Sequence, residues 1–138
     1  MKRLFFLVFI LFSCNNDKIH ESNMVILDNV VKLHDELMLE MKDIKSLKVE
    51  LIEMGFESND TLVADLDKAR SSMMKFMKKF SDEFQFDKYP MNKKKSDSLS
   101  VSSLKLINDQ LVDQKKSIDK VSILFTNSIN NAKKALNN

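Results

Sequence analysis

The chain has 138 residues, which is enough for one domain, and its net charge of +2 is small. One glycine, one proline and no tryptophan argue against a β-rich or loop-rich fold, which needs turn residues about every 8–12 positions. Without Lys2 and Arg3 the chain has 20 basic and 20 acidic residues, so it lacks the positive field that gathers phosphate backbones, and we expect no nucleic-acid partner.

The first 13 residues predict a lipoprotein signal peptide. Lys2 and Arg3 precede the apolar run Leu4–Phe12, which is much shorter than the roughly 20 residues that span a bilayer. The run ends in Leu11-Phe12-Ser13-Cys14, which resembles a bacterial lipoprotein cleavage signal, with Phe12 bulkier than the usual small residue.

Cys14 is the only cysteine, so it cannot form a disulfide within the chain. The resemblance implies a diacylglycerol thioether on Cys14 and an acylated amine, and acyl chains contribute about 0.8 kcal/mol per buried methylene to membrane anchoring. We expect attachment to the outer membrane, at its periplasmic face or the cell surface. The alternative is an ordinary cleaved signal with an incidental cysteine.

Residues 14–23 are polar and predict a flexible tether, with His20 solvated.

The remaining residues, 24–138, predict an all-α fold. Gly55 and Pro90 are the only strong helix breakers and divide the chain into helices at about 22–54, 60–84 and 98–136. The connections are short, which favours antiparallel neighbours and therefore an elongated, coiled-coil-like, up-down-up three-helix bundle. We expect the first and third helices to pair along their length and the second to cover part of them.

The first helix carries an apolar stripe at spacings of three and four residues, as an amphipathic helix does. Up to the point where this spacing shifts slightly, the residues of the stripe are Leu27, Val30, His34, Leu37, Met41 and Ile44. Gly55 fits the position after the helix end, with Phe56 folding back onto the last turn.

The second helix carries a similar stripe, made by Leu62, Leu66, Ala69, Met73, Phe76 and Phe80. It should end before Tyr89, because a residue that precedes proline avoids the helical region. Lys93, Lys94 and Lys95 then predict a loose, solvated approach to the third helix. In the third helix Gln114 occupies a stripe position between Leu111 and Ile118, where the pattern expects an apolar residue.

His34 is the first candidate for a site. We expect it to be buried and neutral, and to bond to Gln114 across the bundle, because a buried polar pair can fix helix register. The alternative is a periplasmic copper-handling site, since thioethers and imidazole suit Cu(I). Its ligands would be drawn from His34, Met38, Met41, Met73 and Met77. Methionines at core spacing are normally packing residues, so we expect no metal.

The sequence predicts no enzyme. No Ser-His-Asp or Cys-His set is available, and a glycine-rich phosphate loop cannot form around Gly55 alone. A carboxylate pair would need a cleft that a slim bundle does not offer. We therefore expect no catalytic residue, no small-molecule substrate and no cofactor other than the lipid on Cys14.

Two methionine-containing motifs lie on the first and second predicted helices. The first is His34-Asp35-Glu36-Leu37-Met38-Leu39-Glu40-Met41, and the second is Ala69-Arg70-Ser71-Ser72-Met73-Met74-Lys75-Phe76-Met77. With these motifs the chain resembles a family of small Bacteroidetes lipoproteins that often carry the label "viral A-type inclusion protein". The resemblance covers most of residues 25–136 and implies a short helical lipoprotein with no established activity. Arg70 and Ser71 stand where the family pattern has His-Asp, so a site built on paired histidines in relatives would be broken here.

These observations predict a structural or protein-interaction role in the bacterial envelope. A second alternative is a helical partner of another envelope protein. Its docking face would be an exposed apolar stripe of Met24, Leu39, Val49 and Ile52.

Overall fold

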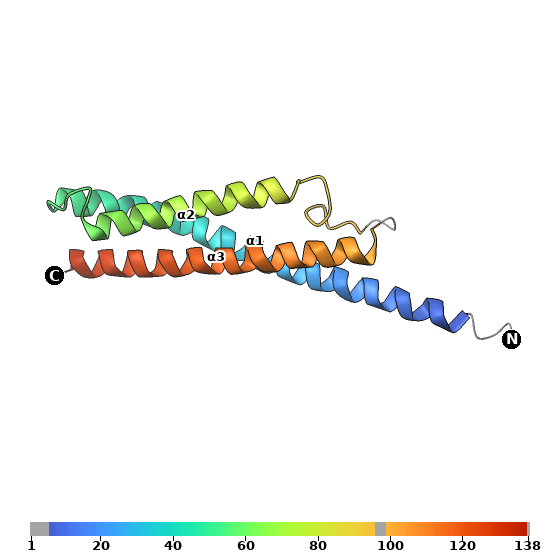
Figure 1. Ribbon diagram of the computed structural model, residues 1–138. Coiled ribbons are helices and arrows are strands. Elements are labelled where there is room, and N and C mark those ends of the chain that lie inside the picture. The colour runs from blue at the N-terminus through green and yellow to red at the C-terminus, as the bar shows by residue number, and fades with distance from the viewer. Residues whose placement is uncertain (1–5, 96–98, 138) are drawn as a thin grey trace.

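The computed structural model describes residues 6–95 and 99–137, and only the backbone of residues 6–15. Three helices pack together, α1 (Phe6–Glu53), α2 (Thr61–Glu83) and α3 (Val101–Leu136), and the described residues form no strand (Figure 1). The prediction of an all-helical bundle is confirmed. Most predicted helix ends lie within one or two residues of those observed. The start of α1 is the large exception, and the predicted start of the third helix, residue 98, lies outside the described residues.

Helix α1 begins 16 residues before the predicted start at residue 22 and runs through residues 14–23, where we predicted a flexible tether. Within this stretch, residues 17–23 make tertiary contacts that favour the helix. Asn23 is completely buried, and His20 lies against Tyr89 of the segment that joins α2 to α3. Weak helix formers such as Asn and Ser are held helical when packing favours it. The expectation of a solvated His20 is therefore wrong.

The α1–α2 connection is a Schellman motif. Gly55 N–H donates to the Ile52 carbonyl and Phe56 N–H to the Leu51 carbonyl, both at 3.0 Å. Gly55 has a φ of 95°, a conformation that glycine adopts without a side-chain clash. Phe56 packs back against the core. The predicted end of the first helix is confirmed.

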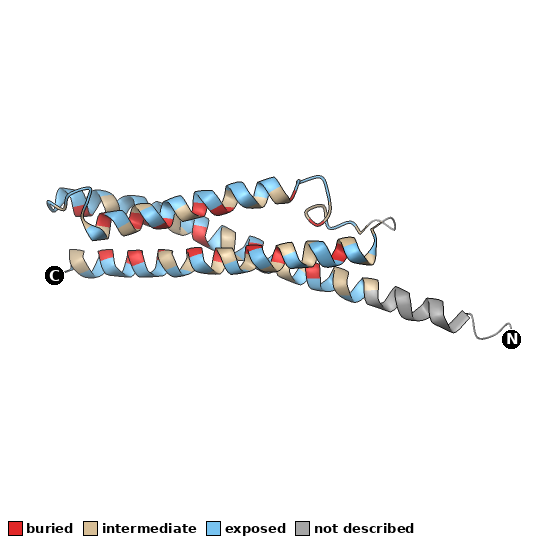
Figure 2. Cartoon of the chain, viewed as in Figure 1, coloured by how far each residue is buried: buried red, intermediate tan, exposed pale blue. Residues whose placement is uncertain are grey.

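The core lies along the inner faces of all three helices (Figure 2). Helices α1 and α3 share the most extensive contact, and α2 packs more against α3 than against α1. The fully buried large side chains include Leu51, Leu66, Met73, Leu111, Ile118 and Phe125. Because α1 and α2 touch least, the surface between them is the least tightly closed side of the bundle.

The α2–α3 linker is held on the bundle at the end nearer the N terminus (Figure 1). Met91 packs against a small second core built on Leu27, Phe84 and Leu111. Lys93, at a φ of 56°, places its ammonium 2.6 Å from the Asp28 carboxylate.

Lys95 pairs with Asp17. The hydrogen bond and charge of Lys95 lower the pKa of Asp17 below its usual value. The prediction of a loose lysine segment is therefore wrong for Lys93 and Lys95, because both attach the linker to α1.

Candidate functional site

Cys14, the predicted lipidation site, lies on α1, but its side chain is outside the described part of the chain. Lipidation therefore stays a prediction. In the residues searched, none of the helices is both long and apolar enough to cross a membrane.

A polar network lies nine residues after Cys14 and is centred on Asn23. The Asn23 amide nitrogen donates to the Tyr89 hydroxyl and to the Leu104 carbonyl, both at 3.1 Å. Its oxygen accepts a hydrogen bond of 2.7 Å from the Asn108 amide. His20 Nδ1 lies 3.1 Å from the Tyr89 hydroxyl, with the two rings tilted against each other. The network ties α1, the linker and α3 together at one level of the bundle.

The hydrogen-bonding atoms of the Asn23 side chain all have partners, and the network is partly shielded from solvent. Asn23 is completely buried and uses both amide protons and its oxygen, which removes the cost of burying an unpaired amide. Burial raises the pKa of Tyr89, and the hydrogen bond from Asn23 and the charge of Lys95 offset part of this rise. The arrangement holds a neutral phenol and joins α1, the linker and α3, so we interpret it as structural.

Sequence reasoning missed this network. One signal was available: Asn23 lies four residues before Leu27, so it continues the apolar stripe of the first helix with a polar residue. A polar residue at a core position predicts a buried hydrogen-bond partner. The identity of that partner was not accessible, because Tyr89 is 66 residues away.

The predicted pair of His34 and Gln114 is wrong. Gln114 is completely buried, but its amide nitrogen donates to Glu83 Oε2 at 2.5 Å. The other amide atom, Gln114 Oε1, is buried without a partner among the described residues. His34 keeps 30% of its side chain exposed and places Nδ1 2.9 Å from Asp35 Oδ1. The stripe position of His34 faces the open α1–α2 side, so it reaches neither α3 nor Gln114.

His34 instead lines an apolar pocket of about 310 Å³ between α1, α2 and the linker. The pocket is formed by Val30, Val31, His34, Asp35, Phe76, Met77, Phe80 and Met91. It brings the imidazole of His34 together with the thioethers of Met77 and Met91, which lie 43 and 57 residues later in the sequence. Met91 was not among the predicted ligands, because it follows a proline in a segment without helical periodicity.

The other methionines of the alternative copper set lie elsewhere. Met73 is completely buried in the main core, and Met41 packs against that core. Met38 is 39% exposed and does not line the pocket. The structure thus places only His34 and Met77 of that set together. Groups of three or more His, Cys, Asp or Glu side chains able to hold a metal are absent from the residues searched.

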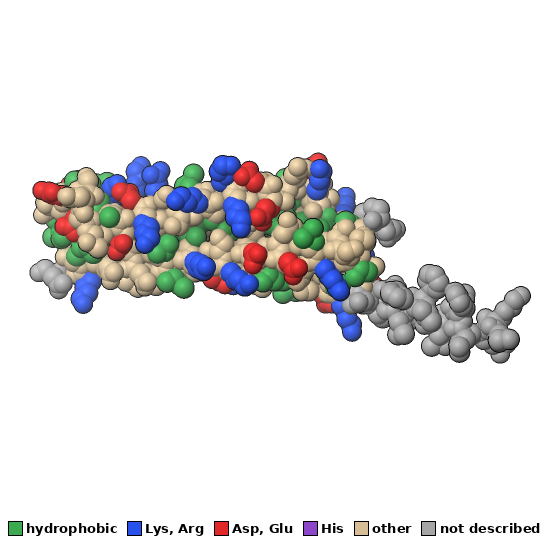
Figure 3. Space-filling model, in the orientation of Figure 1, with side chains coloured by type: hydrophobic (Ala, Val, Ile, Leu, Met, Phe, Trp, Pro, Cys, Tyr) green, Lys and Arg blue, Asp and Glu red, His purple; other side chains and the backbone are tan. Residues whose placement is uncertain are grey.

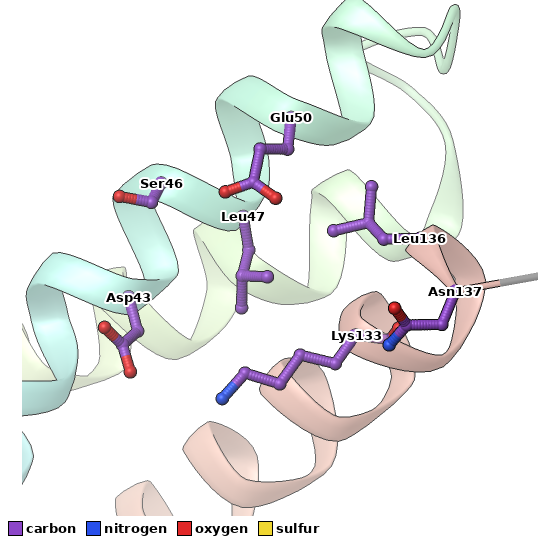
Figure 4. Close-up of a pocket in the computed structure, with 7 residues that line it drawn as sticks. All are labelled: Asp43, Ser46, Leu47, Glu50, Lys133, Leu136 and Asn137. Atoms are coloured by element: carbon purple, nitrogen blue, oxygen red, sulfur yellow. The ribbon is translucent and has the colours of Figure 1, made fainter.

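A second depression, of about 320 Å³, lies between α1 and the C-terminal end of α3 (Figure 4). Asp43, Ser46, Leu47 and Glu50 approach from α1, Lys133 and Leu136 from α3, and Asn137 from the residue that caps α3. The Lys133 side chain extends toward the Asp43 side of the depression, and Leu47 points into the space between the helices. The lining includes two carboxylates, both from α1, and the Lys133 ammonium from α3.

The predicted docking stripe is only partly exposed. Leu39, Val49 and Ile52 are 79%, 48% and 44% exposed, whereas Met24 packs against the second core. Met24 therefore does not belong to that face. On the face shown in Figure 3, lysine, arginine and acidic side chains alternate along the bundle, and hydrophobic side chains lie between them in small groups.

Comparison of the chain with protein-family models, curated proteins and solved structures finds no match.

Proposed function

We propose that the protein is a lipid-anchored helical lipoprotein with a structural or protein-interaction role in the bacterial envelope. In this proposal Cys14 carries the lipid, residues 1–13 are removed, and the remaining chain is an up-down-up, coiled-coil-like bundle. The observation that carries the proposal is the position of the only cysteine, directly after the apolar run and the small residue Ser13. The family resemblance of the two methionine motifs points the same way.

The packing around α1 supports a rigid attachment. From Cys14 to Glu53 the helix would extend about 60 Å at about 1.5 Å per residue. The Asn23 network and the pairs Lys93–Asp28 and Lys95–Asp17 fasten the linker to the part of α1 nearest the lipid. We infer that the bundle would stand close to the membrane with little freedom to bend at its base, which suits a spacer or scaffold.

The test is fractionation of cells that express the full chain. The wild-type protein should sediment with outer membranes, leave them only with detergent, and incorporate labelled palmitate. Cys14→Ser should lose the label and the detergent requirement. Ser13→Ala is the matched control, because it keeps a small residue before the cysteine and should behave as wild type. Palmitate-free wild-type protein, or membrane attachment that persists in Cys14→Ser, would contradict the proposal.

A second candidate role is a docking partner for another envelope protein. The exposure of Leu39, Val49 and Ile52 on α1 favours it, because exposed apolar side chains on a helix can receive a partner helix. Photo-crosslinking from these three positions in whole cells should give one discrete larger species. Crosslinking from Lys133, an exposed control on α3, should not give that species.

A further inference from the structure

We propose that His34, Met77 and Met91 form a binding site for Cu(I). The three side chains line the same pocket and come from three segments: α1, α2 and the α2–α3 linker. This inference does not rest on lipidation of Cys14, which lies outside the pocket. Its ligands differ from those of the copper alternative that the sequence offers, because Met38, Met41 and Met73 are absent and Met91 is added.

The hydrogen bond of His34 prepares its ring for a metal. A carboxylate only accepts hydrogen bonds, so the 2.9 Å contact with Asp35 Oδ1 places the ring proton on Nδ1. His34 Nε2 then carries the free lone pair. A histidine that donates one ring N–H to a carboxylate and offers the other nitrogen is the usual arrangement in protein metal sites, because it fixes the ring and raises its basicity.

The surroundings select a soft cation. Two thioethers and one neutral imidazole suit Cu(I), whereas Mg²⁺ and Ca²⁺ require oxygen ligands. The remaining lining residues are Val30, Val31, Phe76 and Phe80, together with Asp35, which is engaged with His34. Apolar walls exclude hydrated divalent ions, while a monovalent cation held by neutral ligands loses less on leaving water.

The pocket is also accessible. His34 keeps 30% of its side chain exposed, and Met77 and Met91 are half-buried, so an ion can enter without the core opening. Met73 by contrast is completely buried. Accessible methionines at the edge of a core can move toward a metal because their side chains are flexible.

The first test uses the full chain carrying Cys14→Ser in detergent, so that no thiol competes for the metal. Ag(I) serves as a redox-stable probe of the Cu(I) site, and methyl-labelled methionines are followed by NMR. Of the nine methionines, Met77 and Met91 should shift and should saturate at one equivalent of Ag(I). Shifts confined to exposed Met38 and Met74, or no shift at all, would overturn the proposal.

The second test measures Cu(I) affinity by competition with a chromophoric chelator under reducing conditions. Met77→Leu and Met91→Leu should each weaken binding at least about tenfold, and Asp35→Asn about ten- to a hundredfold through the His34 ring. Met74→Leu, on the exposed surface of α2, is the matched control and should leave the affinity unchanged.

Leu replaces Met with little change in volume, so circular dichroism should show intact helices in each methionine variant. Equal affinity in wild type, Met77→Leu and Met91→Leu would refute the site. Tighter binding of Zn²⁺ than of Cu(I) would refute the assignment of the metal.

Discussion

The two buried side-chain amides, Asn23 and Gln114, differ in how many of their hydrogen-bonding atoms have a partner. Asn23 uses its two amide protons and its oxygen within the bundle. Gln114 uses its nitrogen on Glu83 and leaves Oε1 buried without a partner among the described residues. A buried unpaired carbonyl costs about 1–3 kcal/mol, so Asn23 should stabilise the fold and Gln114 should weaken it.

We predict that Gln114→Met raises the free energy of unfolding by about 1 kcal/mol, because methionine fills a similar volume without an unpaired oxygen. Loss of the hydrogen bond from Gln114 should destabilise the Glu83 carboxylate little, since this carboxylate is partly exposed and lies 3.6 Å from the Lys79 ammonium. Urea denaturation measures the change. Gln110→Met, one turn earlier on α3 and only half-buried, is the control and should change stability less. A loss of stability in Gln114→Met would show that the Glu83 contact outweighs the unpaired oxygen.

Tyr89 is the only tyrosine, so its titration can be read directly from phenolate absorbance. Burial raises its pKa above the ordinary value of 10.0 in the folded protein. The unfolded chain therefore loses this proton first, and the free energy of unfolding should fall as the pH rises above 10 toward the folded pKa. Tyr89→Phe should remove the part of this decrease in the free energy of unfolding that comes from titration of the phenol. The same absorbance midpoint in native buffer and in denaturant would contradict the burial of the phenol.

At the scale of elements, the ends of α1 and α2 and the identity of most core residues could be predicted from sequence. The Schellman motif at Gly55 follows from the single glycine after an apolar stripe. Pro90 sets only an outer limit for α2, which ends at Glu83, before Tyr89. The helical state of residues 17–23 could not be predicted, because it is accompanied by contacts with the linker and α3. Such contacts lie far away in sequence and leave no local pattern.

The pocket lined by His34, Met77 and Met91 could likewise be predicted from sequence only in part. His34 and Met77 could be singled out because they lie on helical stripes. Met91 could not, because the linker has no periodicity and its path over α1 depends on ion pairs and on packing against Leu27. The predicted partner Gln114 failed because helical spacing gives the face of a residue only approximately, and His34 lies at the edge of its stripe, facing α2.

Gly55 provides a prediction at the scale of the α1–α2 connection. A Cβ at this position would meet nothing within 4 Å, so any cost of Gly55→Ala comes from its positive φ alone. We expect a loss of about 1 kcal/mol in the free energy of unfolding, measured with urea. Ser58→Ala, an exposed change in the same connection, should cost much less. An unchanged Gly55→Ala protein would mean that the turn relaxes to negative φ.

At the scale of the whole molecule, the fold is a long bundle whose surface carries both positive and negative side chains. At one end, called the fastened end, the linker is bonded to α1. On one side, called the less closed side, α1 and α2 make few contacts with each other. The fastened end is the end nearer Cys14, where Asn23 and the two lysine pairs hold the linker. The less closed side is the α1–α2 surface that holds His34, Met77 and Met91. This division suits a protein attached at one end and available for binding along its length.

The central claim is that Cys14 becomes the lipidated first residue. Intact-mass and peptide mass spectrometry of the protein extracted from membranes tests it most directly. We predict an N-terminal peptide that begins at Cys14, lacks residues 1–13, and carries the added mass of a diacylglycerol and an amide-linked acyl chain. An unmodified Cys14 within a chain cut at another residue, or one that still carries residues 1–13, would contradict the account.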